Sequence, residues 1–131
     1  MDLIDAAPSA GRHGRIIALL LLGCLAGLIG SDSDSPWSTD LDQAGDAAET
    51  AGKPLVLFFT SQTCPPCQRM HAELEDDSTA RRALRDVVPV LLDVQEHPVL
   101  AHRLRGTTTP TVVLLNRQRR IVRRLVGYQN P

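Results

Sequence analysis

The segment Cys64-Pro65-Pro66-Cys67 holds the residue types and the spacing that could do chemistry in this chain. Two intervening residues let both sulfurs meet at the first turn of a helix, close enough to form a disulfide. The N-terminus of that helix would present unpaired N–H groups and the positive end of the helix dipole, which stabilise a thiolate at Cys64. Cys67, one turn into the helix, is expected to be more buried and less ionised. The spacing predicts a redox pair in which Cys64 attacks, Cys67 resolves, and a mixed disulfide forms with the partner.

The surrounding sequence predicts the elements that hold this pair. Leu55–Phe59 is a short continuous apolar run, typical of a strand that is covered on both faces. Apolar residues at helical spacing occur before this run, over 41–51, and again after the cysteines. Pro89 is expected near the start of the next apolar run, because proline would break a central ladder. The later elements are expected to be a short helix after Asp77-Ser78, a strand over 87–94, a helix that opens at Pro98, and a hairpin of 111–115 with 120–126. This order predicts an α/β fold with helices packed on a central sheet that is parallel at first.

Four pieces of the chain together resemble the thioredoxin superfamily, over the span from Trp37 to Tyr128. They are Lys53-Pro54-Leu55-Val56-Leu57-Phe58-Phe59, Cys64-Pro65-Pro66-Cys67, Thr109-Pro110-Thr111 and the hairpin that ends at Gly127. The resemblance implies a thioredoxin-like fold, a central mixed sheet flanked by helices. It implies that Cys64 and Cys67 are the catalytic residues, with Pro65 and Pro66 in the active-site loop between them. It also implies that no cofactor is bound, since the Cys64–Cys67 disulfide is itself the redox-active group.

The same resemblance assigns substrate binding to Thr109 and Pro110. In the family, the proline at this position follows a cis peptide bond and faces the two cysteines. The residue before it, here Thr109, offers backbone groups that align a substrate strand. Taken by itself, the residue pattern leaves a second interpretation open, a trans proline at a strand edge.

The chain departs from the better-known reductants of this family. Those proteins carry a buried Asp at the position of Phe58 and often a Lys near the position of Leu91. A buried carboxylate could relay protons to the resolving thiol, so proton transfer at Cys67 must here use water or another group. Thr108 stands where relatives commonly have Gly, and partner specificity is therefore not carried over. The usual C-terminal helix is expected to be missing after Gly127, which would leave one sheet face open or covered by a partner or by the N-terminal helix.

Composition narrows the class of protein further. A length of 131 residues allows one domain of the usual size. The formal net charge of −1 and the aromatic content of 3% give no basis for a nucleic-acid partner. Three cysteines are too few for a disulfide scaffold. The composition is that of a small globular domain.

The N-terminal residues are expected to direct export. Residues 1–30 contain the apolar run Ile16–Ile29, which follows basic residues and is shorter than the ~20 residues that span a bilayer. This pattern predicts a cleaved signal peptide or a retained membrane anchor. Residues 31–36 would form a linker and 37–131 the thioredoxin-like domain. The residues before Cys24 resemble a bacterial lipoprotein box, so a lipid at Cys24 is a third interpretation of the leader.

These observations predict a thiol–disulfide oxidoreductase in the periplasm of a Gram-negative bacterium, acting on exported proteins and leaning to reduction. A membrane thiol-electron transporter could re-reduce it, and the oligomeric state is left open. Two alternatives remain. Cys64, Cys67 and His71 could carry a soft metal such as Cu(I), although an exposed helical histidine is the more ordinary explanation for His71. The fold could also serve as a redox-inert binding module.

Overall fold

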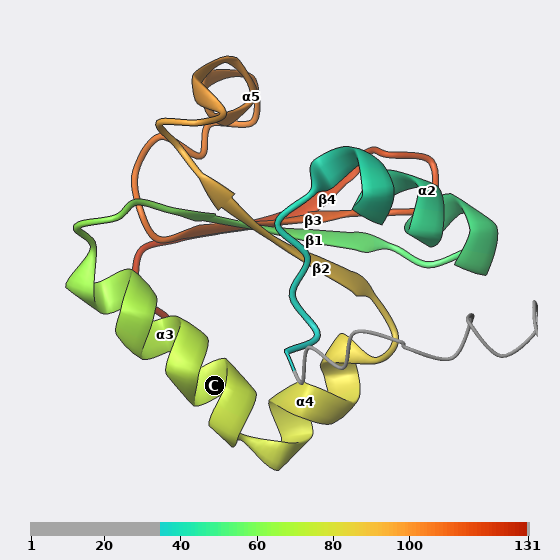
Figure 1. The fold of residues 1–131 in the computed structure, drawn as a ribbon, viewed down its shortest axis with the longest axis horizontal. Coiled ribbons are helices and arrows are strands. Elements are labelled where there is room, and N and C mark those ends of the chain that lie inside the picture. The colour runs from blue at the N-terminus through green and yellow to red at the C-terminus, as the bar shows by residue number, and fades with distance from the viewer. Residues whose placement is uncertain (1–34, 131) are drawn as a thin grey trace, which may run out of the picture. The chain divides into compact units, whose positions relative to one another are not determined.

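The apolar runs form a four-stranded sheet in the computed structural model, which describes residues 35–130 (Figure 1). The strands are β1 (Leu55–Thr60), β2 (Val88–Asp93), β3 (Thr111–Leu115) and β4 (Ile121–Val126), in the order β2-β1-β3-β4. β1 pairs with β2 in parallel and with β3 antiparallel, and β3 pairs with β4 antiparallel. The mixed sheet expected from the sequence is confirmed.

Helices cover both faces of this sheet. Figure 1 shows α2 (Leu41–Ala51) and α5 (Pro98–Arg103) on one side and α3 (Pro65–Asp76) and α4 (Ser78–Leu84) on the other. The local sequence sets their ends. The side chain of Asp40 accepts a hydrogen bond from the N–H of Gln43 at the start of α2, and Gly52 ends that helix at a φ of 62°. Asp77 caps α4 in the same way, as its position before Ser78 predicts.

The side chains of β1 alternate between two apolar clusters, one on each face. Leu55, Leu57 and Phe59 belong to the cluster under α2 and α5, whereas Phe58 points to the cluster under α3. The first cluster consists of Ala44, Ala48, Leu55, Leu57, Phe59, Val90, Leu92, Ala101, Val113 and Leu115. The second consists of Phe58, Cys64, Cys67 and Met70, with Trp37, Leu74, Leu91, Val112 and Tyr128 packed against it. The two cysteines are therefore part of a core.

Pro89 lies in β2 without breaking a ladder. It is the second residue of an edge strand, and its register partner in β1 is Val56. The carbonyl of Pro89 accepts from Ser38 N–H at 3.0 Å, and Leu91 N–H donates to the Ser38 carbonyl at 2.8 Å. Both residues therefore point their backbone groups to the outer edge, where a missing N–H removes no bond to β1.

The α3 face of the sheet is partly open. The described residues after β4 form no helix, and Gln129 and Asn130 instead border a hollow of about 200 Å³. Its other walls are apolar side chains of β1, β3, β4, α3 and α4, together with Trp37. The sequence predicts that one sheet face lacks its usual helix, and this hollow is an opening on the α3 face. The predictions for residues 1–30, for Cys24 and for most of the linker lie outside the described residues.

Candidate active site

Cys64 and Cys67 are joined by a disulfide at the start of α3. Their Cα atoms are 5.2 Å apart. Cys64 is the N-cap residue, and Pro65 and Pro66 form the first two positions of the helix, where their fixed φ favours the helical backbone. The N–H groups of Cys67 and Gln68 both donate to the Cys64 carbonyl, at 3.0 and 3.2 Å. The turn between the cysteines is thus set by backbone hydrogen bonds and by the prolines.

The expectation of several unpaired N–H groups beside Cys64 is wrong. An N-cap side chain ordinarily accepts a bond from the second or third helical N–H. Here the first two positions are prolines, which have no N–H, and the third N–H, that of Cys67, bonds to the Cys64 carbonyl. No side-chain capping bond forms at Cys64. The helix dipole remains. Among the first three helical positions, the Cys67 N–H is the direct donor left for a Cys64 thiolate, and it already bonds the Cys64 carbonyl.

The two sulfurs are buried to different degrees, in the expected order. Cys64 is 5% exposed and Cys67 is 1% exposed. Both pack with Phe58 and Met70. Any partner must therefore reach Cys64 along the exposed surface made by Pro65, Pro66 and the preceding turn.

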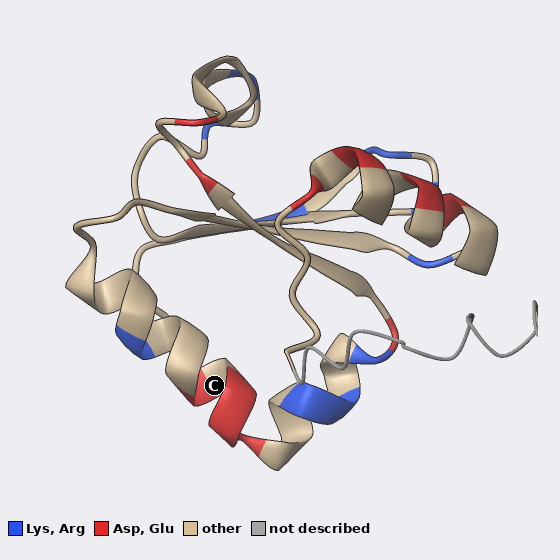
Figure 2. Cartoon of the chain, in the orientation of Figure 1, with Lys and Arg blue, Asp and Glu red and all other residues tan. Residues whose placement is uncertain are grey.

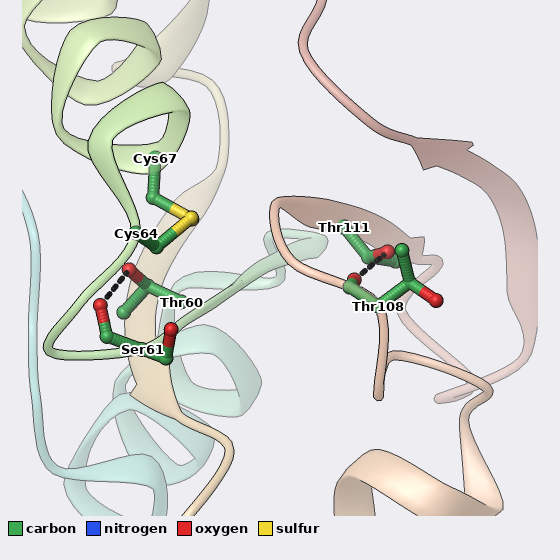
Figure 3. The surroundings of a disulfide bond; sticks show 6 residues. All are labelled: Thr60, Ser61, Cys64, Cys67, Thr108 and Thr111. Carbon is green, nitrogen blue, oxygen red and sulfur yellow. Dashed lines mark hydrogen bonds between the residues drawn. A yellow bond between two sulfur atoms is a disulfide. The ribbon is translucent and has the colours of Figure 1, made fainter.

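The loop before β3 faces this disulfide. The Thr109–Pro110 bond is cis, as the resemblance implies. Phe59 of β1 pairs with Thr111 of β3, which brings the loop to the end of β1 that leads to the cysteines. Figure 3 shows Thr108 and Thr111 on the side to which the disulfide points, joined by a hydrogen bond from Thr111 Oγ1 to the Thr108 carbonyl.

Comparison with known proteins identifies this arrangement. A family model of the thioredoxin-like domain matches residues 41–131. The chain belongs to the thioredoxin-like family. Thioredoxin H4 of Arabidopsis thaliana is 30% identical over 100 residues, which cover 76% of this chain and 78% of that protein. A thioredoxin of Mycobacterium bovis is 30% identical over 89 residues, covering 68% of this chain and 73% of its own.

Solved structures agree with the sequence comparison. A thioredoxin from Thermus thermophilus superposes with a TM-score of 0.64 at 30% identity, covering 72% of this chain and 76% of that one. The thioredoxin-like fold is confirmed. With its Cys-x-x-Cys pair, this member of the family is a thiol–disulfide oxidoreductase.

The site has no carboxylate at the position of Phe58, where the better-known reductants of the family carry a buried Asp. Phe58 is fully buried at that position, and its register partner across the parallel pair is Leu91. Two apolar side chains therefore occupy adjacent positions next to the cysteines. A proton acceptor for Cys67 has to come from elsewhere in the site.

His71 is partly buried, so the ordinary explanation of an exposed helical histidine is wrong. Its ring centroid lies 5.1 Å from that of Trp37 and 6.1 Å from that of Phe58, and its Nε2 atom is buried. Trp37 makes an edge contact with Phe58 at 5.7 Å and so belongs to the α3 cluster. The spacing of four residues indicates that His71 lies near Cys67. The contact with Trp37 joins residues far apart in the sequence, so a local pattern does not predict it.

The end of the chain is tied to α3 by a charged cluster. Tyr128 donates from its hydroxyl to Glu73, and the guanidinium of Arg69 lies 4.9 Å above the tyrosine ring and bonds Glu73 at 2.9 Å. The Tyr128 hydrogen bond, and then the one from Arg69, lowers the pKa of Glu73, while the bond to Glu73 raises the pKa of Tyr128. Gly127 N–H donates to the Pro110 carbonyl at 2.8 Å, so the same tail supports the loop that faces the disulfide.

Within residues 35–130, no three His, Cys, Asp or Glu side chains gather in a way that could hold a metal ion. The grouping of Cys64, Cys67 and His71 as metal ligands thus gains no support from the geometry. The described residues also contain no helix with the length and apolar character needed to cross a membrane.

Proposed function

We propose that this chain reduces disulfides in exported proteins, with Cys64 as the attacking thiol and Cys67 as the resolving thiol. The observation that carries the proposal is the Cys64–Cys67 pair at the start of α3, next to the cis bond of Thr109–Pro110. The pair needs no bound cofactor, because its dithiol form itself carries the two electrons and becomes the disulfide when it gives them up.

The reaction proceeds by two exchanges. In the dithiol form, the Cys64 thiolate attacks one sulfur of the substrate disulfide, and the other substrate sulfur leaves as a thiolate and takes a proton. The Cys67 thiol then loses its proton and attacks the Cys64 sulfur, so that the second substrate sulfur leaves. The substrate ends as a dithiol and the enzyme as the Cys64–Cys67 disulfide. A membrane thiol-electron transporter would return two electrons and two protons.

The proline at the second position of α3 favours the direction of reduction. A thiol pair oxidises others strongly when its reduced form is stabilised, chiefly by groups that stabilise the thiolate. Pro66 removes the second helical N–H, which could do this at the N-cap residue Cys64. The disulfide form is therefore favoured relative to the thiolate, which makes the dithiol the better electron donor.

The surroundings of the pair suit a substrate that is held by its backbone. No Asp, Glu, Lys or Arg occurs in 60–68 or in 106–116, and Figure 2 shows the first turn of α3 and the loop before β3 without charge. Among the described residues, Thr109 takes part in no backbone hydrogen bond, so its N–H and C=O are open to an extended segment. A substrate segment bound in this way forms main-chain hydrogen bonds with the loop, as an added strand would. Its charge contributes little to recognition.

The compartment is proposed from the leader. Export through the apolar run Ile16–Ile29 would place the domain in the periplasm, either free or anchored to the inner membrane. Proteins with disulfides are the substrates that this compartment offers.

Trapping tests both the direction and the roles. In a Cys67→Ala variant expressed in the native host, the mixed disulfide with Cys64 should accumulate as higher-mass species that reductant dissolves. A Cys64→Ala variant is the matched control and should trap none. Rapid alkylation of the wild-type protein in living cells should find the pair mostly reduced; a mostly oxidised pair, or equal trapping by both variants, would refute the proposal.

A further inference from the structure

Cys67, His71 and Glu75 form a single stripe along α3. Each is four residues from the next, so the three side chains lie on one face of the helix, at about 5–6 Å between successive Cβ atoms. The His71 Nδ1 atom is 3.7 Å from Glu75 Oε2, and the other oxygen of Glu75 accepts from Ser35 Oγ at 2.8 Å. A thiol, an imidazole and a carboxylate thus follow one another along the helix.

The free nitrogen of His71 lies inside the packed cluster, on a ring that shares one helix face with Cys67. Side chains on an α-helix lean toward its N-terminus, so the imidazole covers the turn that contains Cys67. With Nδ1 next to Glu75, the inner nitrogen is Nε2, which is buried and has no hydrogen-bond partner among residues 35–130. A buried nitrogen without a partner is costly unless it serves another state of the protein.

Packing holds the ring in this place. Phe58 meets the His71 ring edge-on at an interplanar angle of 86° and also packs against Cys67. Trp37 closes the other side at 5.1 Å. His71 and Cys67 therefore share one wall of the same apolar cluster, at the place where the chain lacks the buried carboxylate.

We propose that His71 accepts the proton of Cys67 when that thiol attacks the mixed disulfide, with Glu75 orienting the ring. This inference rests on the proposed exchange function and assigns its proton acceptor. The Cys67 S–H proton moves to His71 Nε2, the Cys67 sulfur bonds to the Cys64 sulfur, and the Cys64–substrate bond breaks. The departing substrate thiolate then takes the proton from the imidazolium, which restores neutral His71.

Glu75 is the charged group that contacts His71. The contacts from other elements are uncharged, namely Trp37 from the segment before α2 and Phe58 from β1. Arg81 of α4 borders the same surface hollow as Glu75 and Ser35. The electrostatic control of the ring therefore passes through Glu75.

The attack of Cys67 on the mixed disulfide can be followed separately in a reaction that has two phases. In the full chain with Cys24→Ser, the dithiol reacts with a chromogenic aromatic disulfide and releases one coloured thiol when Cys64 attacks and a second when Cys67 resolves. His71→Phe keeps an aromatic ring against Trp37 and Phe58 but removes both nitrogens. Near neutral pH it should slow the second release by roughly 100-fold, the low end of what a positioned base contributes, and leave the first unchanged.

The pH profile separates this role from a structural one. The defect of His71→Phe should vanish at alkaline pH, where the Cys67 thiol ionises without help, and His71→Gln should behave alike if the phenylalanine variant folds poorly. Glu75→Gln should slow the second release less. His102→Phe, at an exposed histidine of α5, is the matched control and should change neither phase.

The outcomes distinguish the two proposals. If the parent chain releases no second thiol, the exchange function itself fails. If the parent shows both phases while His71→Phe matches it in rate and in pH dependence, the function stands and the role of His71 is overturned. Slowing of both phases together would reveal a structural effect and would likewise overturn it.

Discussion

Replacing Pro66 by Ala restores one N–H at the second position of α3 and should make the pair more oxidising. The second helical N–H is one of the two that an N-cap side chain accepts. Cys64 occupies that cap and receives no side-chain capping bond. An alanine at 66 would therefore direct a new donor at the Cys64 sulfur, and this donor would stabilise the thiolate of the reduced protein.

The size of the effect follows from the charge on the acceptor. A hydrogen bond to a charged group contributes about 1.5–3 kcal/mol, and sulfur, a weak acceptor, places this one at the lower end. For a two-electron couple, about 1.4 kcal/mol corresponds to about 30 mV. Above pH ~8.5, the pKa of an ordinary thiol, the reduced protein carries the Cys64 thiolate that the new donor stabilises. At such pH the midpoint potential of Pro66→Ala should thus be about 30 mV less negative than that of the parent.

Pro65→Ala is the matched control for this measurement. It removes the same ring and adds the same freedom to the unfolded chain, but its N–H is at the first helical position, which is not a capping donor. Equilibration of each variant with a series of glutathione buffers, followed by alkylation, gives the potentials. Equal shifts in the two variants, or a shift of Pro66→Ala toward more negative potential, would refute the account of Cys64 given above.

Two further predictions concern stability. Gly106→Ala should lower the free energy of unfolding by about 1–3 kcal/mol in a urea titration, because a Cβ there would lie 2.4 Å from a ring carbon of the fully buried Phe59. Gly45→Ala, inside α2 with only ordinary contacts for a Cβ, should instead raise it by about 0.5–1 kcal/mol, so a loss at both glycines would contradict the packing argument. The bond between Tyr128 and Glu73 should stabilise the fold only in a window of pH. Since it lowers the pKa of Glu73 from 4.5 and raises that of Tyr128 from 10.0, its contribution is present between those values, is lost as pH falls through the folded pKa of Glu73, and is lost as pH rises through that of Tyr128. The difference in urea midpoint between the parent and Tyr128→Phe should therefore shrink at both ends, and a constant difference would show that the bond is not the cause.

The features that the sequence predicts well are those set by neighbours in the chain. The cysteine pair, the cap at Asp77 and the short apolar strand of β1 each depend on a few adjacent residues. The cis bond before Pro110 required the family resemblance, because local sequence favours the trans form. The absence of N–H groups at Pro65 and Pro66 also follows directly from the sequence, because proline has none.

The features that could not be read are contacts between distant segments. Trp37 comes before β1 in the chain and contacts His71, which follows β1, and Ser35 bonds Glu75 across 40 residues. Neither the burial of His71 nor the absence of a partner for its Nε2 atom among the described residues follows from the spacing from Cys67. Both depend on how the segment before α2 crosses the α3 side of the sheet, where Ser38 adds to the edge of β2.

The departures of this site from the family act in a common direction. Pro66, at the second position of α3, withholds a hydrogen bond from the thiolate of Cys64, and the apolar side chains of Phe58 and Leu91 offer no buried charge to Cys67. The first departure strengthens the dithiol as an electron donor. It also makes Cys64 less ready to leave once it is bound to a substrate, because a poorly stabilised thiolate is a poor leaving group. The forward outcome then depends on how quickly Cys67 is deprotonated to attack. Because the reverse reaction is slow, the mixed disulfide persists until Cys67 attacks, and turnover depends on a proton acceptor at Cys67. Among the described residues, the stripe from Cys67 through His71 to Glu75 is the group to which we assign that role.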